Sequence, residues 1–190
     1  MRAFVFRTFL ALCVKYRPEW VIRLQLQVLL DATARAFAMP GKKIRSRTAR
    51  GALREYADFT GKCMKYGKAD PKKVREEACR TGNLIRLITG FRKSRDIERL
   101  VFYLYGNLRI SMSGHIPGEI IVSRCYFGRF YSPEQCALMS LVDEGVIAGI
   151  SGGGRLEFAE RITEGCGRCR AWFCELRVGD GSSHVEYQFR

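Results

Sequence analysis

The stretch that begins at Ser132 constrains the fold of this chain more than any other. Ser132 is a typical helix N-cap, Pro133 suits the first helical position, and Gln135 completes a capping box. Apolar residues continue to Ile150, and three consecutive glycines soon afterwards make further helix costly. One long, largely apolar helix is therefore expected over 132–150.

On either side of this helix lie pairs of segments rich in aromatic and β-branched residues. Strands are expected at 103–112 and 119–127 before the helix, and at 155–163 and 168–177 after it. Short polar turns separate the members of each pair. The order β-β-α-β-β predicts an α+β fold in which one helix covers an antiparallel sheet.

The first hundred residues carry apolar positions at helical spacing instead. Pro18 divides residues 1–38 into two helices, with the break at Tyr16–Pro18. Asp70 followed by Pro71 begins another helix, which should end near Gly82 because glycine is a natural stop. Further helices are expected over 47–66, 83–89 and 94–101.

Charge follows the same division. Residues 41–100 hold eighteen Lys and Arg against seven Asp and Glu, whereas residues 101–190 hold nine against ten. We interpret residues 1–100 as a basic helical region and residues 101–190 as an α+β region that binds a ligand or catalyses a reaction. The two regions are expected to form one compact domain.

The basic region suggests several partners. Nucleic acid is disfavoured, because no helix-turn-helix, zinc-finger or stacking-sheet signature accompanies the charge. Peripheral contact with an anionic membrane is an alternative, since Phe4, Phe6 and Phe9 lie on the basic first helix. The helices could also cap the other face of the sheet or form a homo-oligomer. With neither a membrane-spanning run nor an export signal, the expected location is cytoplasmic.

The helix at 132–150 carries the first candidate site. At about 100° per residue, Cys136, Ser140, Asp143 and Ile147 fall on one face. Cys136 lies in the first turn, where the helix dipole favours a thiolate and could make this sulfur nucleophilic. The alternative is a buried structural cysteine beside a solvated aspartate.

Two further cysteines lie on the predicted strands. Cys125 shares strand parity with Ile121 and Ser123, whereas Cys169 shares it with Ala171 and Phe173. If both faces point at the helix, three sulfurs, those of Cys125, Cys136 and Cys169, converge with Asp143, a set that could hold zinc. The spacing does not require a metal, so a reactive thiol and ordinary burial stay open.

Arginines flank this region on the predicted strands. Arg155, Arg161 and Arg170 alternate with Glu157 and Glu160. They are interpreted either as cross-strand ion pairs on a wet face or as a guanidinium fork for a substrate carboxylate.

Several of these residues occur together in the order of a known family. The pattern comprises Ser123-Arg124-Cys125, then Cys136 and Asp143, then Arg161-Ile162-Thr163-Glu164-Gly165, and finally Cys169 and Phe173. It resembles the L-2-amino-thiazoline-4-carboxylic acid hydrolase family over roughly residues 100–176. The resemblance implies a hydrolase that opens a small carboxylate-bearing C=N heterocycle such as 2-aminothiazoline-4-carboxylate.

The resemblance also implies roles for residues. The catalytic candidates are Cys136, Asp143, Cys125 and Cys169, and the substrate-binding candidates are Ser140, Arg161, Thr163 and Arg124. The inferred step is addition at an amidine-like carbon, by Cys136 or by water that Asp143 activates, with an arginine holding the carboxylate. Asp143 would need a raised pKa to shuttle a proton. No cofactor is required, although zinc is an alternative at the three cysteines.

The β-β-α-β-β outline is also similar to the 4-vinyl reductase domain, a small-molecule-binding module. Zinc-binding examples of that module use a Glu and a Cys upstream of the final Cys. Phe158 and Arg161 stand at the corresponding positions here, which argues against that zinc site. The alternative function is therefore a non-catalytic module that binds or senses a small molecule.

Overall fold

The computed structural model describes residues 2–16 and 18–174 of the 190-residue chain. The helices are α1 (Arg2–Tyr16), α2 (Glu19–Ala36), α3 (Ala49–Tyr66), α4 (Pro71–Thr89), α5 (Ser94–Asn107) and α6 (Pro133–Ser151). The strands are β1 (Ile110–Gly114), β2 (Gly118–Cys125), β3 (Arg155–Glu160) and β4 (Cys169–Cys174), and two short 3₁₀ helices are η1 (Phe127–Arg129) and η2 (Ile162–Glu164). This is the predicted α+β fold.

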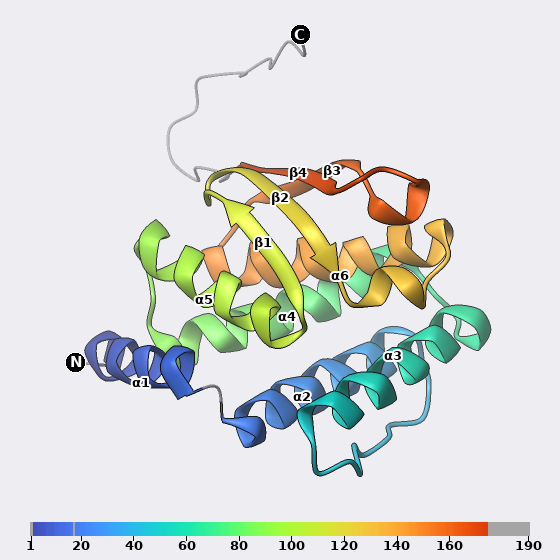
Figure 1. Cartoon of the computed structure of the whole chain (residues 1–190), viewed down its shortest axis with the longest axis horizontal. Helices are drawn as coiled ribbons and strands as arrows, with labels where there is room; N and C mark the ends of the chain where they lie inside the picture. The colour runs from blue at the N-terminus through green and yellow to red at the C-terminus, as the bar shows by residue number, and fades with distance from the viewer. Residues whose placement is uncertain (1, 17, 175–190) are drawn as a thin grey trace, which may run out of the picture.

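The sheet lies at one end of the molecule with the helices layered beneath it (Figure 1). Its antiparallel strands run in the order β1-β2-β4-β3. Helix α6 packs against the sheet, α5 packs against β1, and α4 packs against α6. Helices α2 and α3 form the layer farthest from the sheet, so the N-terminal helices stack on the α6 side and do not cap the other face.

One continuous core connects the two halves of the chain. Fully buried side chains include Leu30 of α2, Val101 of α5, Ile147 of α6 and Phe173 of β4. Within the two described ranges, no helix is both long and apolar enough to cross a membrane.

Helix α6 begins as its sequence predicts. The Ser132 hydroxyl accepts a hydrogen bond from the Gln135 amide (3.3 Å), and the Gln135 side chain accepts one from the Ser132 amide (3.0 Å). These two bonds satisfy amides that the first helical turn leaves without partners. Gly152 ends the helix in the left-handed conformation, with φ of 86°.

The predicted end of a helix at Gly82 is wrong, because α4 continues unbroken to Thr89. A Cβ atom at Gly82 would lie 2.3 Å from the carbonyl oxygen of Val146 on α6. Gly145 and Gly149 of α6 are equally tight, with Cβ positions 2.5 Å and 2.3 Å from α4 carbonyl oxygens. These glycines therefore serve a close helix contact, whose packing outweighs the poor helix propensity of glycine.

The predicted strand at 103–112 begins too early. Helix α5 runs to Asn107, and β1 starts only at Ile110. The buried residues Ile97, Val101 and Tyr105 lie at helical spacing and pack inward, so tertiary burial decides between helix and strand here. Residue 127 and residues 162–163, predicted as the ends of strands, lie instead in η1 and η2, and the predicted end of the last strand at 175–177 falls outside the described residues.

A β-bulge changes the orientation of Cys125. Ser111 pairs with Arg124 but Met112 pairs with Val122, so Ser123 is an extra residue in β2. Because an extra residue inverts the alternation of side chains, Cys125 does not share the face of Ser123 as predicted. It packs instead against the core, on the side of the buried Val122.

Candidate functional site

An apolar cavity of about 340 Å³ lies among the helices and is the candidate site. Side chains of α1, α2, α4, α5 and α6 form most of its wall, together with Tyr56 of α3. Among the described residues that line it, Asp143 is the one Asp, Glu, Lys, Arg or His. The cavity thus combines a hydrocarbon and aromatic surface with a single carboxyl group.

The mouth of the cavity lies among the N-terminal helices. Phe9, Leu24, Val28 and Ile88 line the cavity and are at the same time largely exposed on the surface. They come from α1, α2 and α4, so the entrance is rimmed by apolar side chains. Phe6 also lines the cavity. Two of the three phenylalanines that suggested membrane contact, Phe6 and Phe9, therefore belong to the cavity wall. The Phe4 side chain is outside the described part of the chain.

Asp143 is held in place by a tyrosine. The Tyr105 hydroxyl donates a hydrogen bond to Asp143 Oδ1 over 2.7 Å, and no other hydrogen bond to this carboxyl forms among the described residues. Burial raises the pKa of Asp143 to about 7; the bond from Tyr105 opposes this rise and the nearby Glu144 adds to it. At neutral pH the carboxyl therefore exchanges readily between its acid and its carboxylate.

Aromatic rings form a fixed surface near this carboxyl. Phe127 contacts Tyr56 edge-on, with ring centroids 5.8 Å apart, and stacks on Tyr131 at 5.6 Å. Tyr131 also shares a hydrogen bond with the buried hydroxyl of Thr60. Burial, with the charge of Asp143 adding to it, raises the pKa of both tyrosines, so they stay neutral. Their hydroxyl groups can donate and accept hydrogen bonds but carry no charge.

Two of the predicted catalytic cysteines line the cavity, but their thiols are not activated. Burial raises the pKa of Cys136, although Thr163 and Arg161 oppose the rise, and it raises the pKa of Cys125 to about 11. The prediction that the first turn of the helix lowers the pKa of Cys136 is therefore wrong, because the loss of water outweighs the helix dipole. Both sulfurs remain protonated and weakly nucleophilic at neutral pH.

Four other predicted residues do not line the cavity but lie beside Cys136, which does; they are Ser140, Arg161, Thr163 and Cys169. Cys169 Sγ accepts a hydrogen bond from the Ile162 amide at 3.3 Å and ties η2 to β4. Arg161 donates to Ser140 Oγ at 3.2 Å and pairs with Glu164 at 3.2 Å. Thr163 lies in the same η2 segment. Arg161 is thus engaged within the protein, and the structure does not place it where a ligand in the cavity would meet it.

The remaining arginines of the strands pair with carboxylates. Arg155 pairs with Glu157 at 2.8 Å, and Arg170 pairs with Glu119 across the β2–β4 ladder. The interpretation as a cross-strand ion pair is confirmed for Arg170, whereas Arg155 pairs with a carboxylate of its own strand, β3. A fork that holds a substrate carboxylate is not formed by them.

The predicted convergence of sulfurs on a metal is also wrong. In the described ranges, no three or more His, Cys, Asp or Glu side chains are grouped closely enough to hold a metal ion. Cys136 and Cys125 face the cavity, whereas Cys169 is bonded to the backbone of η2. Cys125, Cys136 and Cys169 all lie on the side of Asp143 and influence one another electrostatically, but their sulfurs are not close enough together to share a metal ion.

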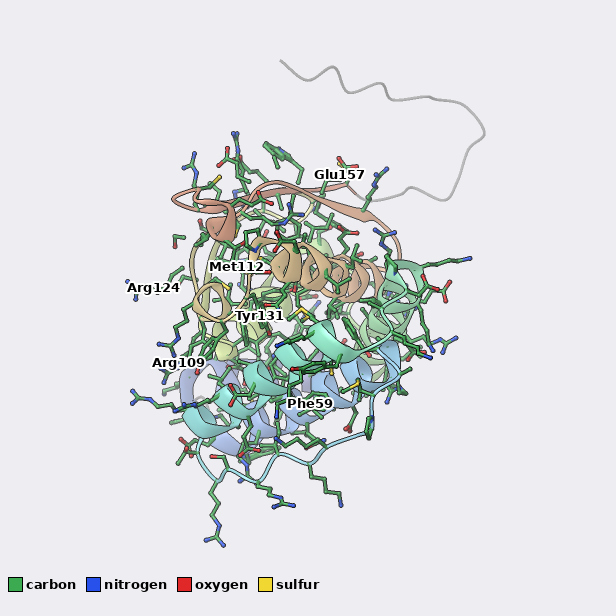
Figure 2. All side chains as sticks on the ribbon, turned by 90° about the vertical axis from the view of Figure 1, so that its right-hand side faces the viewer. Phe59, Arg109, Met112, Arg124, Tyr131 and Glu157 are labelled. Carbon is green, nitrogen blue, oxygen red and sulfur yellow. The ribbon has the colours of Figure 1, made fainter. Side chains whose placement is uncertain are left out.

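Arg124 lies in a different hollow on the surface. This groove, of about 630 Å³, is lined by Arg109, Arg124 and Arg129, and it shares Ile110 and Cys125 with the wall of the cavity. Figure 2 shows Arg109 and Arg124 reaching outward at one side of the molecule, while Tyr131 lies in its interior. Arg124 is therefore separated from Asp143 by the wall between the two hollows.

No known protein family, curated protein or solved structure matches this chain. A function therefore has to be inferred from the chemistry of the cavity and its surroundings.

Sequence reasoning missed most of the cavity wall. Tyr105, the partner of Asp143, fell within a predicted strand, although Ile97, Val101 and Leu104 continue the helical spacing of α5 toward it. Tyr56 lies within the expected helix over 47–66, but nothing in the sequence connected it with a site. The side chains that α1, α2 and α4 contribute to the cavity wall could not be recognised from local sequence, because their position depends on how helices distant in the chain pack.

Proposed function

We propose that this protein binds a small, largely apolar molecule in the cavity, and that Asp143 and Tyr105 hold its one polar group. The observation that carries the proposal is the lining: a cavity of about 340 Å³ with a single carboxyl group in an apolar and aromatic wall. Ligand sites in proteins are commonly cavities of about 300–1,000 Å³ with a few convergent polar groups. A buried, hydrogen-bonded carboxyl with a pKa near 7 is typical of functional sites.

A neutral fluorescent dye tests this proposal. Nile red should bind the wild-type protein with an increase in fluorescence and should raise its melting temperature. Val28→Trp places a large ring in the cavity wall near the mouth, at a position where the valine is 39% exposed and the fold tolerates a larger side chain. We expect it to weaken dye binding about tenfold, or roughly 1.4 kcal/mol.

The matched control is Val14→Trp. Val14 lies on α1, is 49% exposed and does not line the cavity, so the same substitution there should leave dye binding unchanged. Circular dichroism checks that both variants are folded. If the wild-type protein does not bind the dye, or if both tryptophan variants bind it equally well, the cavity is not a ligand site.

The hydrolase activity implied by the resemblance is a second candidate function. One observation favours it: a pKa of Asp143 near 7 suits a group that takes up and releases a proton during hydrolysis. The thiols are protonated, and the arginines do not line the cavity. The structure therefore supports hydrolysis less well than it supports ligand binding.

The direct assay uses 2-aminothiazoline-4-carboxylate and follows its conversion to a ring-opened product. The wild-type protein should turn the substrate over, and Asp143→Asn should abolish turnover while folding is retained. Glu157→Gln is the matched control, because Glu157 pairs with Arg155 on the exposed face of β3 at 2.8 Å and does not line the cavity. Absence of turnover in the wild-type protein, with dye binding intact, leaves a binding module.

A further inference from the structure

The charge of the cavity stands in contrast to the charge of the chain. The protein has 33 Lys and Arg and a net charge of +14, yet no cationic side chain is among the described residues that line the cavity. Asp143 is the only lining residue that carries a full charge at mildly alkaline pH. A ligand with a carboxylate or phosphate would therefore meet a like charge and no counter-charge.

The surroundings of Asp143 suit a positive charge. The carboxyl receives one hydrogen bond, from Tyr105, so it retains acceptor capacity for a second donor. The rings of Tyr56, Phe127 and Tyr131 also line the cavity, and the faces of aromatic rings attract cations. An isolated carboxylate in an apolar cavity is costly, and a cation that pairs with it removes much of that cost.

We propose that the cavity binds a lipophilic amine, a ligand with an apolar body and one protonated nitrogen that pairs with Asp143. This inference rests on the proposed ligand-binding function and specifies its ligand class. The apolar body occupies the hydrocarbon part of the cavity, and the ammonium donates a charge-assisted hydrogen bond to the carboxylate. The amine excludes water from Asp143 in the same step.

The pairing makes binding depend on pH. The ligand selects ionised Asp143, whose pKa lies near 7 because of burial, so affinity should rise between pH 5 and 8. Burial raises the pKa of the tyrosines and cysteines that face Asp143, so they are neutral over this interval, and the nearby Glu144 raises the pKa of Asp143; none of these groups reverses the trend. They are Tyr105 of α5, Tyr56 of α3, Tyr131, Cys125 of β2, Cys169 of β4, and Cys136 and Glu144 of α6.

Three ligands of one shape test the inference. Isothermal titration calorimetry compares 2-(1-naphthyl)ethylamine, 2-(1-naphthyl)ethanol and 1-naphthylacetate at pH 8 and pH 5.5. We expect the amine to bind about tenfold more tightly than the alcohol at pH 8, with the acid weakest, and the preference for the amine to shrink at pH 5.5.

Two variants complete the experiment. Asp143→Asn should lower the affinity for the amine to that for the alcohol and leave the alcohol unchanged, whereas Glu157→Gln, on the exposed face of β3, should preserve the preference. An alcohol that binds as tightly as the amine, or a preference that survives in Asp143→Asn, overturns the inference while the cavity remains a binding site. Failure of all three ligands to bind overturns the proposed function together with the inference.

Discussion

The cavity and the arginine groove share a wall but differ in almost every other respect. Ile110 and Cys125 line both, yet the cavity contains one carboxyl in an apolar surface, whereas the groove is lined by Arg109, Arg124 and Arg129. The cavity is built by helices from the whole length of the chain, and the groove by α5, β1, β2 and η1 alone. The residues Ile110 and Cys125 therefore separate an apolar surface from a basic one.

This comparison shows where the basic residues of the chain lie relative to the cavity. The positive charge of the front half lies on the helices and on the segments that connect them, and no described Lys or Arg lines the cavity. A charge inside the cavity has to be stabilised without water, whereas a charge in the open groove remains hydrated. The following predictions test this difference.

The largest expected effect is the pH dependence of stability due to Asp143. Its pKa is raised from 3.8 to about 7, so the folded state keeps its proton where the unfolded state has lost it. Stability is then full below about pH 4 and falls between pH 4 and 7, by up to about 4 kcal/mol. Urea titrations of the wild-type protein and of Asp143→Asn should show this difference emerging as the pH rises, in favour of the variant.

Arg124→Gln is the control for that experiment. Arg124 is exposed in the groove, so the free energy difference between Arg124→Gln and the wild-type protein should not change with pH over the same interval. A flat profile for Asp143→Asn as well would show that its carboxyl is hydrated in the folded protein.

The next effect concerns the helix contact behind the cavity. Gly82→Ala puts a Cβ atom 2.3 Å from a backbone oxygen of α6, which cannot move independently of its helix. We expect a loss of about 2 kcal/mol or more from the free energy of unfolding. Gly61→Ala on α3 has no heavy atom within 4 Å of the new methyl group and should instead gain up to about 1 kcal/mol. Urea denaturation measures both free energies of unfolding. If the two variants changed the free energy in the same direction, the close contact between α4 and α6 would be contradicted.

A smaller effect is expected for anions in the groove. Inorganic phosphate should bind weakly at low ionic strength, and Arg124→Gln should reduce this binding severalfold by removing one of three guanidinium groups. NMR titration is suited to such weak binding. Arg155→Gln, in an ion pair on β3, is the control with the same change of charge, and Val28→Trp should not affect phosphate at all. If Arg155→Gln weakens phosphate equally, the groove has no special affinity.

The smallest effect is on the reactivity of thiols. Cys174 is exposed and should react first with N-ethylmaleimide, while the raised pKa values of Cys125 and Cys136 slow their reaction. Nile red in the cavity should slow Cys125 and Cys136 further and leave Cys174 unchanged. Mass spectrometry of digested protein resolves each site. A fast reaction at Cys136 would restore the interpretation of this residue as a nucleophile.

Local signals predicted the fold where the determining contacts are local. The capping box at Ser132 and the proline break at Pro18 depend on neighbouring residues, and both are confirmed. Gly82 and Tyr105 were assigned wrongly, because partners distant in the chain determine their conformation: α6 for the first, and the core around Asp143 for the second. The bulge at Ser123 was not predictable from alternation, which presupposes a regular strand.

The site was predicted only in part for the same reason. Helical periodicity identified Asp143 and Cys136 as neighbours of a functional face, and both line the cavity. The helix dipole predicted a lowered pKa for Cys136, but it carries no information about burial, which raises that pKa. The family resemblance placed Arg161 and Arg124 in one site with Asp143, but Arg124 lines the groove and Arg161 bonds to Ser140.

The glycine contact between α4 and α6 also governs how the protein is made. Gly82 and Gly149 meet in the folded molecule but are 67 positions apart in the chain, so α4 leaves the ribosome long before its partner exists. Until α6 arrives, the side of α4 that carries Val74 and Ala78 stays open to water. Such long-range closure slows folding and exposes apolar surface to association. The contact between α4 and α6 therefore cannot form until residues near 150 have been synthesised.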